Sequence, residues 1–344
     1  MTTVVIGSYF EDEHVRRIRE LDGRLRALYR EDLVPPPRWP GDHAGPEGWR
    51  RSPEEDEEFL AMLAEAEVLY DFPRVHVQDL TQVAPKLRWV QASMAGAGEV
   101  AKSAGLLETD VVVTTASGVY SGPLAEFVVM AMLQHAKHLD RLQRDKIEKA
   151  WRQTYSDTLE GKTLCVVGMG NIGRAIAERV RPFGTRILGV KRTVRENDPA
   201  RNHADELYGT DRLYGALGEA DYVVVTLPGT PETHHLVDAG TIAAMKPGAY
   251  FANVGRGSVV DERSLVEALK RGHLSGAALD VFEAEPLPRE SSLWGLENVI
   301  ISPHATDMVP SIINKRQTDL FCENLRRYLD EEPLVNVLDK RLLY

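Results

Sequence analysis

Ten short apolar runs, separated by stretches of helical length, constrain the fold of this 344-residue chain more than any other feature of its sequence. Most of the runs are rich in β-branched residues and apolar almost throughout, which is typical of strands covered by helices on both faces. The alternation predicts an α/β fold with two doubly wound parallel sheets, one for each set of runs. The first set comprises residues 3–7, 68–71, 88–92 and 111–114, and the second comprises residues 163–167, 186–190, 222–226, 249–253, 276–280 and 299–301.

Two helical stretches and one loop lie among these runs. Apolar residues at helical spacing predict a long helix over residues 122–151, and a second helix over 310–330 that returns to pack on the first domain. The segment 35–53 holds six prolines and three glycines, and this density of helix and strand breakers predicts a surface loop. The alternative interpretation is a lid that places Trp39 or Trp49 over a site.

Charge and cysteine content exclude several classes of protein. Lysine and arginine number 41 against 52 aspartates and glutamates, a net charge of −11 that argues against binding to nucleic acid or to an anionic membrane surface. The N-terminus has no basic and apolar leader, and the longest apolar run is far too short to cross a membrane. Cys165 and Cys322 are too far apart in sequence for a metal knuckle, no other cluster has metal-ligand spacing, and a reducing cytoplasm is the predicted location.

A glycine-rich turn, Gly168-Met-Gly-Asn-Ile-Gly173, follows one predicted buried strand and opens a helical stretch. This context makes the G-x-G-x-x-G pattern informative. Gly168 permits the tight turn, Gly170 lets the backbone approach a pyrophosphate, and Gly173 lets helix and strand pack closely. Unpaired N–H groups near Asn171 and Ile172 would attract the phosphates. The turn predicts a dinucleotide site, and an αβ turn without a ligand is the alternative.

The end of the next strand distinguishes between the two nicotinamide dinucleotides. An acid about 20 positions after the glycines would bind the ribose 2′-hydroxyl of NAD. Here that position is Lys191, and Arg192, Thr193 and Arg195 follow it. A cationic cluster fits a 2′-phosphate, because charge-assisted hydrogen bonds contribute about 1.5–3 kcal/mol each. The sequence therefore predicts that NADP(H) is preferred, with NAD(H) possible, and the alternative is a solvated basic loop.

Three residues that can serve hydride chemistry follow three successive predicted strands. Arg256 can hold a substrate carboxylate with its planar fork, and His304 can exchange a proton with the oxygen of a carbonyl or alcohol. Glu285 can pair with His304 and favour its charged form, although Glu283 competes for that role. Because the carboxyl ends of parallel strands meet at one edge of a sheet, we expect the three to converge. Structural roles in tight or solvated loops are the alternatives, and His234 and His235 are predicted to be solvated.

Several motifs in order and at matching spacing carry a family resemblance. They are residues 159–163, Gly168–Gly173, 226–233, 253–261, 278–288 and 302–304. From Leu159 to Thr306 the chain resembles the NAD(P)-binding domain of the D-isomer-specific 2-hydroxyacid dehydrogenases, and within that family it is similar to NADP-dependent glyoxylate/hydroxypyruvate reductases.

The resemblance implies roles for individual residues. Arg256 takes the substrate-orienting role, Glu285 that of the paired carboxylate and His304 that of the acid/base. Asp280 matches the residue that contacts the nicotinamide carboxamide. The backbone amides of Ala97 and Gly98 match the loop that holds the substrate carboxylate, with Arg256 and His304 completing the substrate site. The remaining cofactor-lining positions implied are Leu227, Pro228, Thr233, Val254, Gly255 and Thr306.

The resemblance also implies the domain organisation and the assembly. A flavodoxin-like substrate domain is expected over residues 1–117, completed by 304–344. A Rossmann nucleotide-binding domain is expected over 118–303, with the active-site cleft between the two. Its helical stretch 122–151 matches the family's dimerisation arm, which implies a homodimer.

The function expected from these features is hydride transfer between NADP(H) and a small 2-oxo acid or D-2-hydroxy acid. One alternative is an NAD-dependent dehydrogenase of a larger or phosphorylated 2-hydroxy acid. A second alternative is a dinucleotide-sensing binding protein that resembles the corepressors of this family. The presence of Arg256, Glu285 and His304 argues against this alternative.

Overall fold

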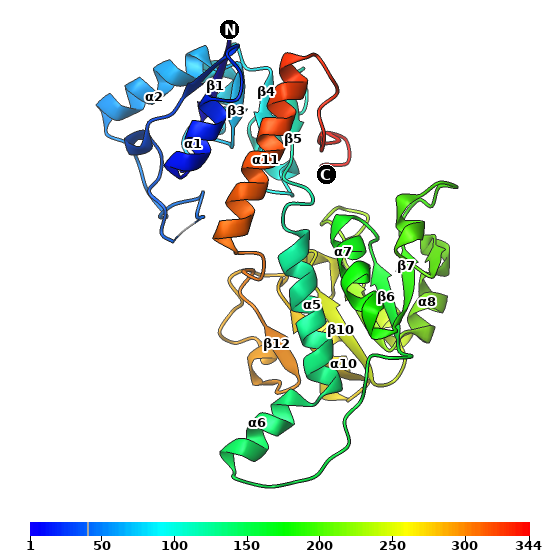
Figure 1. Cartoon of the computed structure of the whole chain (residues 1–344). Coiled ribbons are helices and arrows are strands. Elements are labelled where there is room, and N and C mark those ends of the chain that lie inside the picture. Colours follow the sequence, from blue (N-terminus) through cyan, green and yellow to red (C-terminus); the bar gives the residue numbers. More distant parts are fainter. Residues whose placement is uncertain (40) are drawn as a thin grey trace. The chain divides into compact units, whose positions relative to one another are not determined.

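The chain divides into two compact units in the computed structural model, which describes residues 1–39 and 41–344. Unit 1 comprises Met1–Tyr120 and Met308–Tyr344, and unit 2 comprises Ser121–Asp307. The boundaries predicted from the sequence, 117/118 and 303/304, lie close to these. Figure 1 labels many of the elements of both units.

Unit 1 is a five-stranded parallel sheet in the order β2-β1-β3-β4-β5, the flavodoxin-like order that the sequence predicts. The sequence missed β2, Leu25–Leu28, because this edge strand contains no β-branched residue. The other strands are β1 (Thr2–Ile6), β3 (Val68–Tyr70), β4 (Trp89–Gln91) and β5 (Val112–Thr114). The helices are α1 (Asp12–Arg19), α2 (Pro53–Glu65), α3 (Leu80–Val83), α4 (Gly98–Ser103) and α11 (Pro310–Leu329), with a 3₁₀ turn η1 (Glu31–Leu33).

Both faces of this sheet are covered, because alternate strand residues point to opposite sides. Val5 and Leu69 face a core formed with α2, α3 and α4. Val4 and Tyr70 face the other core, to which α1 and α11 contribute. Phe321 of α11 is completely buried there. The C-terminal helix therefore returns to the first unit, which confirms the prediction for 310–330.

Unit 2 is a seven-stranded parallel sheet in the order β12-β11-β10-β9-β6-β7-β8, a doubly wound Rossmann arrangement. The short edge strand β8, Glu206–Tyr208, was not predicted. The other strands are β6 (Thr163–Val167), β7 (Arg186–Val190), β9 (Tyr222–Val225), β10 (Ala249–Asn253), β11 (Leu274–Leu279) and β12 (Val299–Ile301). The helices are α5 (Ser121–Ala136), α6 (Leu139–Ile147), α7 (Asn171–Val180), α8 (Leu213–Glu219), α9 (Ala239–Ala243) and α10 (Glu262–Lys270). Short 3₁₀ turns are η2 (Arg181–Phe183), η3 (Pro199–Asn202), η4 (Thr210–Arg212), η5 (Gly257–Val259) and η6 (Ser292–Gly295).

The predicted single helix over 122–151 is wrong: two helices, α5 and α6, occupy this stretch, with no helix after Ile147. His138 breaks the helix, because its φ of 51° is in the left-handed region. The returning chain then binds the end of α5, where the Asp157 N–H donates to the Ala136 carbonyl at 2.8 Å. α5 packs along α7, as Figure 1 shows, and α6 continues beyond it.

The proline-rich segment 35–53 is a loop over the residues that the structure describes, while Pro40 lies outside them. The loop ends at Ser52, which caps α2 in a reciprocal capping box with Glu55. Arg51 fastens it to unit 1, since Nε donates to the Leu33 carbonyl at 2.6 Å and the guanidinium lies 3.6 Å from the centre of the Phe59 ring. Among the described residues, no helix is both long enough and apolar enough to span a membrane.

Candidate functional site

The glycine-rich turn lies where strands β6 and β9 are neighbours and the strand order reverses, the position at which doubly wound sheets bind ligands. Gly168 follows β6 with a φ of 110°, which side chains rarely tolerate. The Thr226 hydroxyl donates to the Gly168 carbonyl and lies 2.7 Å from where a Cβ on Gly168 would sit. The turn is thus closed against the loop after β9.

The other two glycines of the turn differ in their surroundings. A Cβ on Gly173 would collide with the Gly168 carbonyl and lie 2.9 Å from Val166, so glycine is needed where α7 packs on the sheet. A Cβ on Gly170 would meet no protein atom within 4 Å. Gly170 precedes Asn171 and Ile172 in the first turn of α7, whose N–H groups favour an anion. The residues present therefore fit a pyrophosphate.

The predicted cationic cluster follows β7, and its members differ in their contacts. Lys191 Nζ donates to both oxygens of Asp198, at 2.7 and 3.0 Å, and this hydrogen bond is the main cause that lowers the pKa of Asp198. Asp198 is buried and lies seven positions downstream, so the local pattern gave no sign of the pair. Arg192, Thr193 and Arg195 are exposed on the same loop.

The loop after β9 approaches the turn after β10. Gly255 has no space for a side chain, since a Cβ would lie 2.5 Å from the carbonyl oxygen of Leu227. Thr233 holds the β9 loop from within: its hydroxyl donates to the Pro228 carbonyl at 2.7 Å. Leu227, Pro228 and Thr233 are partly buried, whereas Val254 is buried.

Asn253, which the sequence analysis did not select, shapes the turn that carries Arg256. Its side-chain amide donates to the Arg256 carbonyl at 3.0 Å, and its oxygen accepts the Gly255 N–H at 3.1 Å. Asn253 is 1% exposed and ends an otherwise apolar strand. A polar residue at such a position needs hydrogen-bond partners, and this signal could have identified Asn253 as a residue that shapes the turn. The Arg256 side chain is exposed, and its Nη1 donates to the Gly255 carbonyl at 2.8 Å.

His304 and Glu285 are paired as predicted. The distance from His304 Nδ1 to Glu285 Oε2 is 2.8 Å, and the other carboxylate oxygen accepts the Phe282 N–H at 3.0 Å. Because an ionised carboxylate only accepts hydrogen bonds, His304 donates through Nδ1 and its Nε2 is available for other partners.

Asp280 holds the backbone that follows His304. Its Oδ1 accepts the N–H groups of Ala305 and Thr306, at 3.1 and 3.3 Å, and the residue is 1% exposed. These bonds stabilise His304 in the left-handed region, with a φ of 53°. The Thr306 hydroxyl is buried and has no hydrogen-bond partner among the described residues.

Asp307 is a second residue that the sequence analysis missed. Burial raises the pKa of its carboxyl, and the neighbouring Asp280 raises it further, while His304 and Arg256 lower it. The charges of both His304 and Arg256 therefore act on Asp307. The local sequence His304-Ala305-Thr306-Asp307 contains no pattern that would reveal these interactions of Asp307.

The predicted substrate loop lies in unit 1. Ala97 and Gly98 are buried at the start of α4, and a Cβ on Gly98 would collide with Leu343 of the C-terminal segment. The exposed residues of the loop are Met94, Ala95 and Gly96.

His235, which the sequence predicts to be solvated, has a side chain that is 39% exposed, and its ring also pairs with the Glu283 carboxylate. This contact joins two loops and residues 48 positions apart, so no local pattern signals it. His234 is exposed and stacks on the His235 ring with the ring centres 4.0 Å apart.

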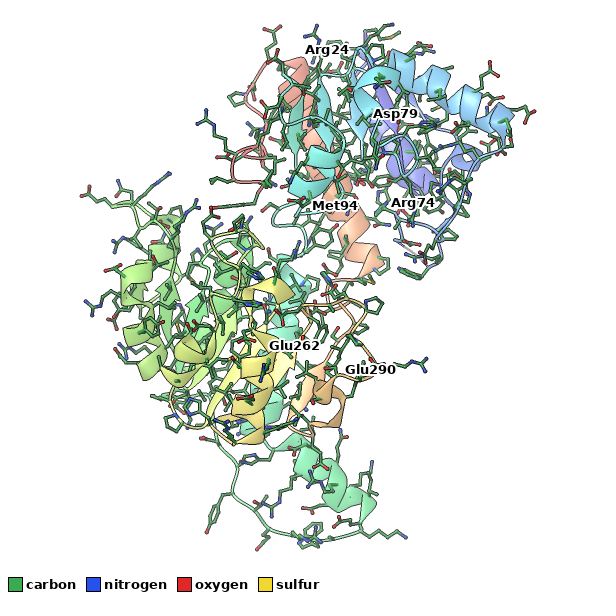
Figure 2. All side chains as sticks on the ribbon, turned by 180° about the vertical axis from the view of Figure 1, so that it is seen from behind. Arg24, Arg74, Asp79, Met94, Glu262 and Glu290 are labelled. Carbon is green, nitrogen blue, oxygen red and sulfur yellow. The ribbon has the colours of Figure 1, made fainter. Side chains whose placement is uncertain are left out.

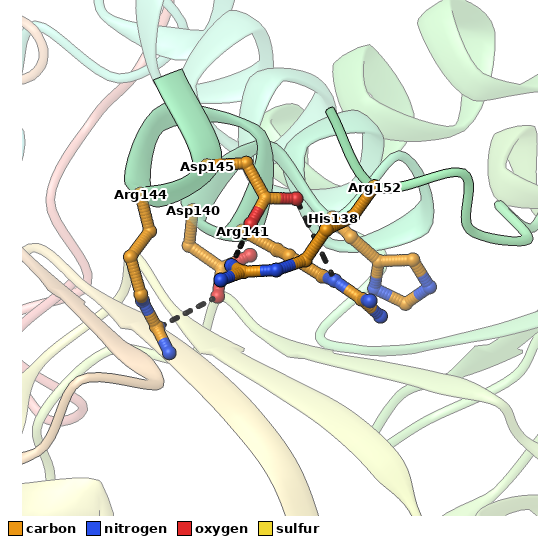
Figure 3. A pocket seen from close by; sticks show the side chains of 6 residues that line it. All are labelled: His138, Asp140, Arg141, Arg144, Asp145 and Arg152. Atoms are coloured by element: carbon orange, nitrogen blue, oxygen red, sulfur yellow. Dashed lines mark hydrogen bonds and ion pairs between the residues drawn. The ribbon is translucent and has the colours of Figure 1, made fainter. Parts of the chain in front are cut away.

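A polar pocket of about 290 Å³ lies elsewhere on unit 2, along α6 and the chain that follows it. Figure 3 shows Arg152 reaching Asp145, with Nη1 2.6 Å from Oδ1. The pocket contains none of the predicted site residues; its lining is His138, Asp140, Arg141, Arg144, Asp145 and Arg152.

Known proteins share both the sequence and the fold. The family model described as the NAD binding domain of D-isomer specific 2-hydroxyacid dehydrogenase matches residues 129–306. A glyoxylate reductase from Korarchaeum cryptofilum is 32% identical over 272 residues, 77% of this chain and 80% of the relative.

Solved structures match over the whole chain, among them the following two. A D-isomer specific 2-hydroxyacid dehydrogenase from Xanthobacter autotrophicus, in complex with NADPH and MES, has a TM-score of 0.77 and 28% identity, and covers 100% of this chain and 99% of its own. An NADPH-dependent glyoxylate/hydroxypyruvate reductase from Sinorhizobium meliloti, in complex with NADP and sulfate, has a TM-score of 0.78 and 25% identity, and covers 100% of both chains.

The position of Asp307 generates a prediction about stability. A carboxyl whose pKa is raised by folding binds its proton more tightly in the folded state, so its stabilising contribution is present below its usual value of 3.8. That contribution is lost as the pH rises through the raised pKa. We expect Asp307→Asn to unfold at a higher temperature than the unsubstituted chain at pH 7, with a smaller difference at pH 4. Thermal unfolding at both pH values measures this, with exposed Asp211→Asn as control; a difference independent of pH would contradict it.

Proposed function

Because the chain belongs to the D-isomer-specific 2-hydroxyacid dehydrogenase family, we propose that it transfers a hydride between NADP(H) and a small 2-oxo acid. The direction proposed is reduction, as in a glyoxylate/hydroxypyruvate reductase. The observation that carries this proposal is the 2.8 Å hydrogen bond between His304 and Glu285, on the same edge of the sheet as Arg256 and the glycine-rich turn.

The residues that would hold the dinucleotide are those of the turn and its neighbouring loops. Gly170 and the first turn of α7 offer N–H groups to the pyrophosphate. Arg192 and Thr193, which are exposed after β7, would hold the adenosine 2′-phosphate, and Leu227 and Gly255, whose backbones are in contact, would line the rest of the dinucleotide. When bound, NADPH supplies the hydride.

The chemistry left to the protein is binding of an acid and delivery of a proton. Arg256 can form two parallel hydrogen bonds with the substrate carboxylate, which also places a positive charge near the carbonyl. His304 donates the proton from Nε2 to the carbonyl oxygen as negative charge develops there. Glu285 accepts a hydrogen bond from the opposite nitrogen, so it fixes the orientation of the ring.

We also propose that the chain forms a homodimer through α5, α6 and the segment that follows. Large apolar side chains are exposed along this stretch, and Trp151 is 96% exposed. The others are Met130, Leu139, Leu142, Ile147 and Tyr155. A second copy that covered them would remove this apolar surface from water. The proposed location is the cytoplasm, and the buried free thiols Cys165 and Cys322 are compatible with a reducing compartment.

The first test is an assay of NADPH absorbance with a panel of 2-oxo acids that includes glyoxylate and hydroxypyruvate. We expect His304→Ala to lower kcat by about 10²-fold or more, because general acid catalysis contributes 10²–10⁴-fold. In the same assay, Arg256→Ala should raise the KM of the 2-oxo acid as well as lower kcat. His203→Ala, on the surface of unit 2, is the control. If no 2-oxo acid is reduced, or if His304→Ala keeps full activity, the proposal fails.

The second test concerns the choice of dinucleotide. Because the Arg192 guanidinium is exposed and can form two parallel hydrogen bonds with a phosphate, we expect it to contribute more than the Lys191 ammonium to binding of the 2′-phosphate. Arg192→Ala should lower kcat/KM for NADPH by about 10–100-fold, the loss of one charge-assisted hydrogen bond, and change that for NADH by less than about threefold. Lys191→Ala should lower kcat/KM for NADPH less than Arg192→Ala does. Arg263→Ala is the control, because the Arg263 side chain is 90% exposed. Equal losses with NADPH and NADH would contradict this assignment.

The third test concerns assembly. Burial of a large apolar side chain contributes about 1.5–3 kcal/mol, so Ile147→Glu combined with Trp151→Glu should weaken a dimer by about 100-fold or more. Sedimentation over a range of concentrations measures the dissociation constant. Tyr214→Glu, an exposed aromatic on α8, is the matched control. A monomeric unsubstituted chain, or a dimer unaffected by the double substitution, would refute the proposed interface.

A further inference from the structure

Residues 280–288 form the loop that carries Glu285. A second acid of this loop, Glu283, bonds to neighbouring elements. Glu283 Oε2 accepts the Glu262 N–H at 3.2 Å, and Glu262 Oε2 accepts the Glu283 N–H at 3.4 Å. The second oxygen of Glu283 pairs with His235 Nε2. Glu283 thus joins its own loop to the start of α10, where Figure 2 labels Glu262, and to the loop after β9.

The same peptide contacts the turn of Arg256. A Cβ on Gly257 would collide with the Phe282 carbonyl and lie 2.6 Å from the Glu283 nitrogen. The residue next to Arg256 therefore packs directly against the backbone of Phe282 and Glu283. If the peptide between Phe282 and Glu283 moved, the turn of Arg256, the loop of Glu285, or both would have to move with it.

A chain of contacts then leads to His304. The Phe282 N–H, one position before Glu283, donates to Glu285 Oε1 at 3.0 Å. The other oxygen of Glu285 is the partner of His304. The restraints on Glu283 consequently act on the carboxylate that orients the proposed acid.

The charges around this pair show that the arrangement has a cost. Burial raises the pKa of Glu262, the hydrogen bond that its carboxylate accepts from the Glu283 N–H lowers it, and the negative charge of Glu283 raises it. Among the described residues, three groups face the cluster from other elements. His235 pairs with Glu283, and His234 stacks on His235. The third group is Asp261, on which the charge of His235 also acts. The Glu262 and Glu283 carboxylates repel each other, and a loop could be fastened to α10 without placing two acids side by side.

We propose that Glu283, held by His235 and Glu262, is a positioning residue that sets Glu285 and His304 in register with the turn of Arg256. This inference rests on the proposed function, since it concerns the same reaction. Glu283 acts through Glu285 and has no part in proton or hydride transfer itself.

The test is kinetic. Small misplacements of a catalytic group can cost up to 10²-fold, so we expect Glu283→Ala to lower kcat for 2-oxo acid reduction by about 10-fold or more, with the KM of NADPH changed less than about twofold. Glu283→Gln, whose amide oxygen can still accept the Glu262 N–H, should restore kcat to within about threefold. Glu290→Ala is the matched control: an exposed acid in the segment before η6, labelled in Figure 2.

A lower unfolding temperature with unchanged kcat in Glu283→Ala would overturn the proposal, and so would a loss confined to the KM of NADPH. If Glu283→Ala does not fold, His235→Ala removes one of the two restraints from a partly exposed position; reduced kcat supports the proposal and unchanged kcat overturns it.

Failure of the proposed function would be recognised separately, because the unsubstituted protein would then reduce no 2-oxo acid. Crystal structures of the unsubstituted chain and of Glu283→Ala, or of His235→Ala, would still decide the inference. A displaced Glu285 supports it, and an unchanged 2.8 Å contact between Glu285 and His304 overturns it.

Discussion

The hydrogen bond from His304 Nδ1 to Glu285 is the interaction on which the proposed chemistry of this protein depends. A carboxylate accepts but does not donate, so the bond determines that Nδ1 carries a proton and that Nε2 is the nitrogen able to serve a substrate. The remaining contacts of the site maintain that arrangement. Asp280 holds the backbone after His304 in its left-handed conformation, and the Phe282 N–H holds the second oxygen of Glu285.

Close approach of backbone to backbone brings these groups together. At Gly168, Gly255 and Gly257 a side chain would collide with a neighbouring loop or lie within 2.7 Å of it, so the loops that leave β6, β9, β10 and β11 rest directly on one another. Parallel strands deliver all these loops to the same edge of the sheet. A site built in this way is set by main-chain contacts, and its few polar side chains, such as Asn253, bond mostly to backbone groups.

The sequence predicts the parts of this arrangement that are local. The G-x-G-x-x-G turn and the central strands of both sheets follow from patterns within a few residues, and these patterns predict the two parallel sheets that the structure contains. Strands β2 and β8 were missed because a short edge strand needs neither a continuous apolar run nor β-branched residues. The break at His138 was missed because the returning chain, not a local proline or glycine, stabilises the end of α5.

Contacts between distant residues account for the rest. Asp198 engages Lys191 within one loop, and Glu283 engages His235 from another loop, and in each case the pairing is fixed by how the loops fold. A charge that a sequence offers to a ligand can therefore already be partly neutralised by the protein. This distinction matters most in a chain with a net charge of −11 whose proposed ligands are anions, since attraction then depends on a small number of local cations. Arg256 and Arg192 are both exposed on loops at the carboxyl edge of the sheet, so an acidic surface and an anion-binding site can coexist in one molecule.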